Sequence, residues 1–188
     1  MQFSSKAEMQ HTVSPIDGSV FVSRPLADEQ QVLASIEQAT AAYHSTECSW
    51  KTTPLSQRKA LCQKAIEQLL THKGDIAKEL SWMMGRPIRY GAGELAGVAE
   101  RSDYMLSICE QALADIKLED KPGFSRYIKR ESLGVVLVIA PWNYPFLTAI
   151  NAIIPALLAG NCVILKHSAQ TPLCAERLYQ AFTDAGLP

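Results

Sequence analysis

The spacing of apolar residues changes along the chain and predicts two kinds of structure. Up to about residue 113, apolar positions recur every three or four residues, which is typical of amphipathic helices. A turn at residues 14–18, between two short extended pieces, precedes these helices. The helices are expected to begin at Asp28, Thr53–Pro54, Asp75 and near Gly93, and the last of them to end at Leu113. The N-terminal part of the chain is therefore predicted to be mainly helical.

Local signals support these helix boundaries. Asp28 and Gln31 have the spacing of a capping box, and Pro54 stands where the first turn of a helix tolerates proline. Gly85 and Pro87 are expected to end the helix that starts at Asp75. The side chains predicted to face inward are Val32, Ile36, Ala39 and Tyr43 in the first helix, Cys62, Ile66 and Leu69 in the second, and Leu95, Val98, Met105 and Cys109 in the last.

The period changes after a loop at residues 119–123. Residues 124–131 alternate in the manner of an exposed strand or ribbon. Residues 135–139 are wholly apolar, which favours a strand buried on both faces of a parallel sheet. An apolar helix to about residue 159 and a second buried strand at 162–165, ending in Lys166, follow. Strand, helix and strand within roughly thirty residues form a βαβ unit, which is expected to be right-handed.

These elements predict an α/β fold with an incomplete Rossmann-like parallel sheet. A last helix is expected from Thr171–Pro172 to near Gly186, and two strands alone would leave long apolar edges bare. The expected domains are a helical part of a cofactor-binding domain at 1–123, a ribbon segment at 124–133, and the βαβ unit at 134–188. The helical part is expected to pack against the same sheet.

Composition and charge restrict the class of protein. The net charge of -1 gives no reason to expect nucleic acid or an anionic membrane as a partner. The first residues lack the apolar core of a secretory signal, no apolar run reaches the length of a membrane span, and the cysteine pattern favours a reducing compartment, so a cytoplasmic protein is expected. The 5 cysteines are scattered and never form a CxxC pair, and the histidines are equally dispersed, so neither a disulfide framework nor a metal site is expected.

Candidate chemistry gathers after the two predicted parallel strands, because ligands of open α/β sheets bind beyond the carboxyl ends of their strands. Asn143 offers an amide that can stabilise negative charge developing on a carbonyl oxygen, and Lys166 offers an ammonium that can hold a cofactor hydroxyl or phosphate. Both have an ordinary alternative interpretation. Asn143, two residues before Pro145, is a natural turn residue, and a lysine at a strand end often simply meets solvent.

Two other features resemble chemical sites but lack the context that such sites need. Residues 91–96 match the G-x-G-x-x-A dinucleotide pattern, but residues 84–90 before them form a helix end and a loop, not the required strand. The cysteines are interpreted as small buried hydrophobes. Cys174 lies at a helix N-terminus, where the pKa of a thiol can fall, but no base lies near it in the sequence.

The chain resembles the aldehyde dehydrogenase superfamily. The resemblance is carried by Ala-Pro-Trp-Asn-Tyr-Pro at residues 140–145 and continues through residues 154–161 and 166–172. The turn at 14–18 and Met-Gly-Arg-Pro at 84–87 are similar to further family segments. The likeness therefore covers the chain from about residue 12 to residue 188.

The resemblance implies oxidation of an aldehyde to an acid with NAD or NADP. In the family a cysteine thiolate forms a thiohemiacetal, hydride passes to the nicotinamide, and a glutamate activates the hydrolytic water. Asn143 matches the side-chain donor of the oxyanion hole, and Lys166 matches the residue that holds the adenosine ribose. The residues expected at the cofactor are Ala140, Pro141, Trp142, Asn143, Lys166, His167, Ser168 and Ala169. The ribbon is similar to the start of the family's oligomerisation arm, which implies a parent homodimer or homotetramer.

Two features depart from the family pattern. NAD-preferring members often carry a glutamate three residues after the lysine, and Ala169 stands there, so NADP is expected to be tolerated or preferred. Family members are considerably longer, and their nucleophilic cysteine, base and second glycine-rich segment are expected beyond Pro188, so this stretch alone is expected to be inactive. The alternatives are a short binding or assembly module that pairs through the ribbon, and a CoA-acylating or phosphate-reducing relative, which also uses cysteine chemistry. The sequence does not identify the aldehyde.

Overall fold

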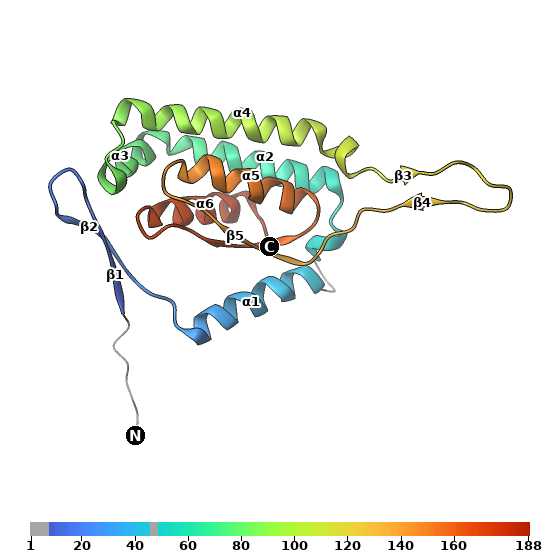
Figure 1. Cartoon of the computed structure of the whole chain (residues 1–188), viewed down its shortest axis with the longest axis horizontal. Helices are drawn as coiled ribbons and strands as arrows, with labels where there is room; N and C mark the ends of the chain where they lie inside the picture. Colours follow the sequence, from blue (N-terminus) through green and yellow to red (C-terminus); the bar gives the residue numbers. More distant parts are fainter. Residues whose placement is uncertain (1–7, 46–48) are drawn as a thin grey trace, which may run out of the picture.

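The computed structural model describes residues 8–45 and 49–188, which form a mixed α/β fold (Figure 1). Its elements in chain order are β1 (Met9–Val13), β2 (Val20–Pro25), α1 (Glu29–His44), the 3-10 helix η1 (Trp50–Thr52), α2 (Leu55–Thr71), α3 (Lys73–Met84), α4 (Ile88–Leu113), β3 (Ile116–Lys117), β4 (Tyr127–Ile128), β5 (Val135–Ile139), α5 (Pro145–Leu158), β6 (Cys162–Lys166) and α6 (Pro172–Ala185). Every helix expected from the apolar spacing is present. No helix within the described ranges is long and apolar enough to cross a bilayer.

The two apolar runs pair in parallel, as predicted. The register runs from Val135 opposite Cys162 to Ile139 opposite Lys166, and the Ala140 amide extends it by donating to the Lys166 carbonyl at 3.1 Å. Both α1 and α5 contact the two strands, and in Figure 1 α1 lies below them while α5 lies above. Since parallel strands end at the same edge, the loops after β5 and β6 begin side by side.

The predicted helix boundaries are largely confirmed. The Asp28 carboxylate accepts from the Gln31 amide at 2.8 Å, and the Gln31 side chain accepts from the Asp28 amide at 3.0 Å, which completes the capping box. Gly85 ends α3 in the left-handed conformation, with φ of 75°. The next helix begins at Ile88, earlier than the expected Gly93, because Pro87 cannot continue α3 but is well suited to start α4.

The core lies among helices α2 to α6, and most of the side chains predicted to face inward are buried in it. The prediction is wrong in the first helix: Val32 is 48% and Ile36 is 44% exposed, because α1 packs only along one side, against β5 and β6. In α4, Leu106 is buried and Met105 only half-buried. The apolar spacing therefore predicted where the helices lie, but it did not predict which face of α1 is buried.

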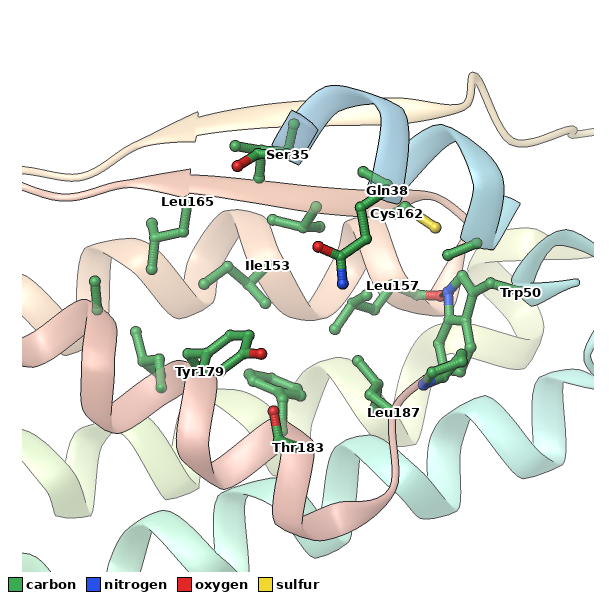
Figure 2. Close-up of a pocket in the computed structure, with 18 of the residues that line it drawn as sticks. Ser35, Gln38, Trp50, Ile153, Leu157, Cys162, Leu165, Tyr179, Thr183 and Leu187 are labelled. Atoms are coloured by element: carbon green, nitrogen blue, oxygen red, sulfur yellow. Dashed lines mark hydrogen bonds between the residues drawn. The ribbon is translucent and has the colours of Figure 1, made fainter. Parts of the chain in front are cut away.

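The prediction that β5 is covered on both faces is also wrong for the described residues. Only Val138 is buried, and Leu137 and Ile139 are 60% and 69% exposed. Leu137 and Ile139 lie on the same face of β5, and their side chains are left uncovered by α1 and α5; the sheet itself has two strands. Beside β6 an apolar groove of about 650 Å³ opens between α1 and α6, with Trp50 and Leu187 at one end (Figure 2). This groove is the bare edge that the sequence led us to expect.

The predicted ribbon is a hairpin that projects from the rest of the chain (Figure 1). Strand β3 pairs with β4 in antiparallel fashion, with Ile116 opposite Ile128, so the strand expected over 124–131 is paired over two residues only. Because β3 also belongs to the hairpin, the boundary expected between residues 123 and 124 falls in its turn, where Gly123 has φ of 78°. Phe124 and Tyr127 are 64% and 56% exposed on it.

The rejected glycine pattern at residues 91–96 lies inside α4, so no strand precedes it, as expected. A Cβ at Gly91 would lie 2.7 Å from the Cα of Ala77, whereas a Cβ at Gly93 would meet open space. Gly91 is therefore required by the close approach of α3 to α4. We expect Gly91→Ala to lower the free energy of unfolding by about 1–3 kcal/mol through overpacking.

The matched control is Gly93→Ala, which places a methyl group on the same helix without a steric clash and is expected to raise the free energy of unfolding by up to about 1 kcal/mol. Urea unfolding of both variants checks the pair. Equal effects of the two substitutions would contradict the packing explanation.

Candidate functional site

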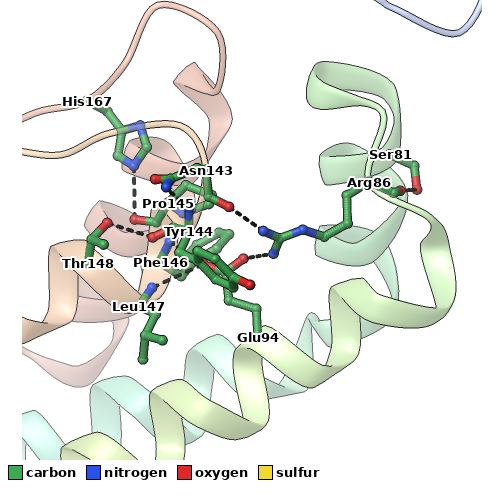
Figure 3. Close-up of polar contacts among 10 residues, drawn as sticks. All are labelled: Ser81, Arg86, Glu94, Asn143, Tyr144, Pro145, Phe146, Leu147, Thr148 and His167. Atoms are coloured by element: carbon green, nitrogen blue, oxygen red, sulfur yellow. Dashed lines mark hydrogen bonds and ion pairs between the residues drawn. The ribbon is translucent and has the colours of Figure 1, made fainter.

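The candidate site is the edge of the sheet where β5 and β6 end. Lys166 is the last residue of β6 and is exposed, while Asn143 lies on the loop between β5 and α5. Because Ile139 pairs with Lys166, both loops leave from this one edge. Figure 3 shows Asn143 beside His167, the residue after Lys166. The juxtaposition expected from the sequence is therefore present.

The amide of Asn143 is oriented by its neighbour. The backbone N–H of Tyr144 donates to Asn143 Oδ1 at 3.0 Å, which fixes the oxygen end of the amide. The other end, Nδ2, makes no hydrogen bond to any residue in the described ranges, and Asn143 is exposed. The loop thus presents an uncommitted N–H donor next to the start of α5.

The first turn of α5 is capped by a residue of a distant helix. Tyr144, the N-cap residue, makes no side-chain cap, and instead Glu94 of α4 accepts from the amides of Phe146 and Leu147 at 2.9 and 3.1 Å. The Glu94 side chain is 1% exposed. A carboxylate there satisfies two orphan amides and complements the helix dipole. Sequence reasoning missed Glu94; the available signal was an acidic residue beside the inward-facing Leu95.

Arg86 links this carboxylate to the loop. Its Nη1 pairs with the second oxygen of Glu94, and its Nη2 donates to the Asn143 carbonyl (Figure 3). The guanidinium also lies 4.9 Å from the centre of the Tyr144 ring. In the sequence Arg86 stood out only as part of the family-like segment 84–87, and its role in the site was not predicted.

His167, expected at the cofactor, has its imidazole turned inward. Its Nδ1 accepts from the Ser168 amide at 2.9 Å, so Nε2 carries the proton and donates to the Pro145 carbonyl at 3.2 Å. Burial is the main reason that the pKa of His167 is lowered, which favours this neutral form. The ring joins the two loops and is 9% exposed, so it has no ring nitrogen left for a ligand.

The loop after β6 is held by the N-terminal hairpin. The Ala169 carbonyl accepts from Gln10 Nε2 at 2.5 Å and from Thr12 Oγ1 at 3.0 Å, while the Ala169 side chain remains exposed. Gln170 reaches the Met83 carbonyl at the end of α3. No local pattern in the sequence predicts the roles of Gln10 and Thr12, because their partner lies more than a hundred residues away.

The other residues expected at the cofactor differ in their exposure to solvent. Ala140 is buried, and its amide is used in the pairing with Lys166. Pro141 and Trp142 are exposed, with Trp142 at 52%, and Ser168 is half-buried, its hydroxyl accepting from the Gln170 amide at 3.2 Å. The edge of the sheet therefore offers the side chains of Trp142, Asn143, Lys166 and Ala169 to solvent.

The cysteines within the described ranges are buried, which confirms their interpretation as small hydrophobes; Cys48 lies outside those ranges. Burial raises the pKa of Cys62 to about 12 and also raises the pKa of Cys162. The pKa of Cys174 is raised well above its usual range by burial, so its place at a helix N-terminus does not activate it. These three thiols do not supply a nucleophile.

Comparison with known proteins gives a match to the model of the aldehyde dehydrogenase family over residues 3–188. The chain is 33% identical to the succinate-semialdehyde dehydrogenase [NADP(+)] of Deinococcus radiodurans over 179 residues, which are 94% of this chain and 36% of that protein. It is 31% identical to the D-glyceraldehyde dehydrogenase (NADP(+)) of Picrophilus torridus, over 98% of this chain and 37% of that protein.

A solved structure is similar over nearly the whole chain. The crystal structure of an NAD-dependent benzaldehyde dehydrogenase from Corynebacterium glutamicum superposes with a TM-score of 0.85 at 28% identity, over 96% of this chain and 39% of that one. The chain thus spans well under half the length of these relatives.

Proposed function

This chain belongs to the aldehyde dehydrogenase family, and we propose that its full-length protein oxidises an aldehyde to a carboxylic acid with NAD⁺ or NADP⁺. The observation that carries the proposal is the uncommitted Nδ2 donor of Asn143 at the same sheet edge as Lys166. A small aldehyde is the proposed substrate; a nucleic acid or a membrane is not a proposed partner.

In the proposed mechanism a cysteine thiolate, from outside the buried thiols described above, attacks the aldehyde carbon. The carbonyl π electrons move to oxygen, and the Asn143 Nδ2–H donates to the resulting oxyanion of the thiohemiacetal. Because Tyr144 already fixes the amide, this donor needs no reorientation as the charge develops. A water activated by a glutamate then hydrolyses the thioester that follows oxidation.

The residues present fit a dinucleotide at this edge. A bound nicotinamide cofactor would accept the hydride of the thiohemiacetal carbon. Lys166 would hold the adenosine ribose, and the Pro141 backbone with the Trp142 ring would line the cleft. Ser168 and Ala169 would face the ribose on a loop that Gln10 and Thr12 hold in place. In this proposal His167 contributes by orienting that loop, and Ala140 by its place in the sheet.

The two-stranded sheet and the hairpin are proposed to belong to larger structures. We propose that β5, α5 and β6 begin a Rossmann-like sheet, and that a further strand fills the groove at the free edge of β6. Residues 1–123 would be the helical part of the same domain, with β3 near its end supplying one strand of the hairpin. The hairpin, with the exposed Phe124 and Tyr127, would be the oligomerisation ribbon of a homodimer or homotetramer in the cytoplasm.

Cofactor preference can be tested at Ala169. A carboxylate at this position would accept from ribose hydroxyls and repel a 2′-phosphate, so Ala169→Glu is expected to shift the ratio of kcat/KM for NADP⁺ over NAD⁺ toward NAD⁺ by about tenfold or more, or about 1.4 kcal/mol. Steady-state kinetics of the full-length protein with both cofactors measures this ratio. Ala169→Gln is the control, because it adds similar bulk without charge. A wild-type preference for NAD⁺ of tenfold or more would refute the NADP assignment.

The function itself is tested by following reduced nicotinamide with a panel of aldehydes. The full-length protein is expected to reduce NAD⁺ or NADP⁺ only when an aldehyde is present and to release the acid. Residues 1–188 alone are expected to be inactive, since the cysteines described in them are buried with raised pKa values or closely packed. An inactive full-length protein that still associates with an active relative through the hairpin would favour the assembly module instead.

A further inference from the structure

A buried ion pair stands behind the loop that carries Asn143. The side chains of Arg86 and Glu94 are 11% and 1% exposed, and neither takes part in the chemistry proposed above. Figure 3 shows the pair between the start of α4 and the start of α5, with its hydrogen bonds directed at the loop. A buried pair is a weak source of stability, because the cost of removing both charges from water offsets their attraction. Its hydrogen bonds therefore point to another role.

The pair holds the loop at two places, one on each side of Tyr144. On one side Arg86 Nη2 donates to the Asn143 carbonyl, and on the other Glu94 Oε1 accepts from the amides of Phe146 and Leu147 at 2.9 and 3.1 Å. The contact of Arg86 with Glu94 Oε2 makes the two anchors one unit.

Tyr144, between the anchors, is the residue that orients the catalytic amide. Its N–H donates to Asn143 Oδ1, and its ring lies against the Arg86 guanidinium. The Tyr144 carbonyl accepts from the Thr148 hydroxyl at 2.6 Å, and the following Pro145 carbonyl from His167. A shift of Arg86 would thus move the Asn143 peptide and the N–H that sets the direction of its amide.

We propose that Arg86 and Glu94 are positioning residues for the oxyanion donor Asn143. The proposal rests on the function proposed above. An oxyanion donor acts through its preorganised position, and a misplacement of about 1 Å can lower a rate by roughly a hundredfold. The pair would therefore act on the rate of the chemical step and not on the binding of the cofactor.

The first experiment is Arg86→Lys in the full-length protein. Lysine keeps the positive charge beside Glu94 but cannot present two fixed, diverging N–H donors to Glu94 and to the Asn143 carbonyl. We expect kcat to fall by about tenfold to a hundredfold, with the KM for the nicotinamide cofactor changed by less than about twofold. Glu94→Gln, which keeps an acceptor for Phe146 and Leu147 but removes the charge, is expected to lose less activity.

The control is another partly buried pair among the described residues, Arg177 with Glu79. It joins α6 to α3 at 2.5 and 3.1 Å and has no hydrogen bond to the loop. Arg177→Lys is expected to leave kcat unchanged, even where it lowers the thermal midpoint as much as Arg86→Lys does. A loss of kcat that simply follows the thermal midpoint in both variants would overturn the proposal.

The decisive measurement is a double-mutant cycle with Asn143→Ala. If Arg86 acts through Asn143, the double variant loses no more activity than Asn143→Ala alone, within about threefold. Losses that multiply would overturn the positioning role while leaving the proposed function intact. If Asn143→Ala itself keeps the wild-type kcat, the proposed function fails first. If Arg86→Lys does not fold, the same cycle with Glu94→Gln decides between the same outcomes.

Discussion

Replacement of Asn143 by alanine in the full-length protein is expected to lower kcat for aldehyde oxidation by about a hundredfold to a thousandfold, or about 3–4 kcal/mol of transition-state stabilisation. The reason is that the Nδ2 donor of Asn143, free among the described residues, is lost, while its Oδ1 only orients the amide. The side chain is exposed and makes no packing contact on which the core depends. The fold should therefore survive, and steady-state kinetics can be read as an effect on the reaction.

Asn143→Asp sharpens this experiment. Aspartate keeps the size of the side chain and the acceptor for the Tyr144 amide, but it replaces the donor by a negative charge facing the developing oxyanion. Its kcat is expected to be at most that of the alanine variant, with the KM for the cofactor little changed. An aspartate variant that retains more than about a tenth of the wild-type kcat would contradict the assignment of Asn143 as the oxyanion donor.

The arrangement of this site was partly predictable, because the two apolar runs and the helix between them indicate one parallel sheet. The runs at 135–139 and 162–165 are apolar enough to require a sheet, and the connecting helix forces the strands to be parallel. Parallel strands end together, so the residues after them must converge. Asn143 and Lys166 could be placed at one edge without any knowledge of their side-chain contacts.

The residues that support the loop were not predictable from the sequence. Glu94 and Arg86 reach the loop at 143–147 only because α4 packs on α5, and their partners lie 52 to 57 positions further along the chain. In the sequence Glu94 lies within a false dinucleotide pattern, and only its burial reveals it as a helix cap. Local periodicity carries no information on such contacts.

The sequence pattern also did not predict which apolar side chains are buried. The spacing of Val32 and Ile36 marks an apolar face of α1, and Leu137 and Ile139 mark a second face of β5, yet all four are exposed. Hydrophobic spacing shows which side chains gain from being covered, but not what covers them.

Trp50 carries the largest expected effect on stability. It is 2% exposed in η1, at the end of the groove beside β6, and its indole N–H donates to the Leu157 carbonyl at 3.2 Å (Figure 2). We expect Trp50→Ala to lower the free energy of unfolding of residues 1–188 by about 3–5 kcal/mol, because the indole leaves a cavity between α1 and α5. Urea unfolding measures the change.

Two further substitutions separate the contributions to this loss. Trp50→Phe removes the N–H but keeps much of the ring, and because the Gly160 amide also donates to the Leu157 carbonyl at 2.9 Å, that oxygen keeps a partner and the hydrogen bond should account for only about 1 kcal/mol. Tyr179→Ala removes an aromatic ring that is 72% exposed beside the same groove and should cost about 0.5 kcal/mol or less. Losses at Trp50 and Tyr179 of similar size would show that the indole is not a core residue. Since Trp50 contacts α5 at Leu157, the end opposite to Asn143, Trp50→Phe in the full-length protein should leave kcat close to the wild-type value below its thermal midpoint.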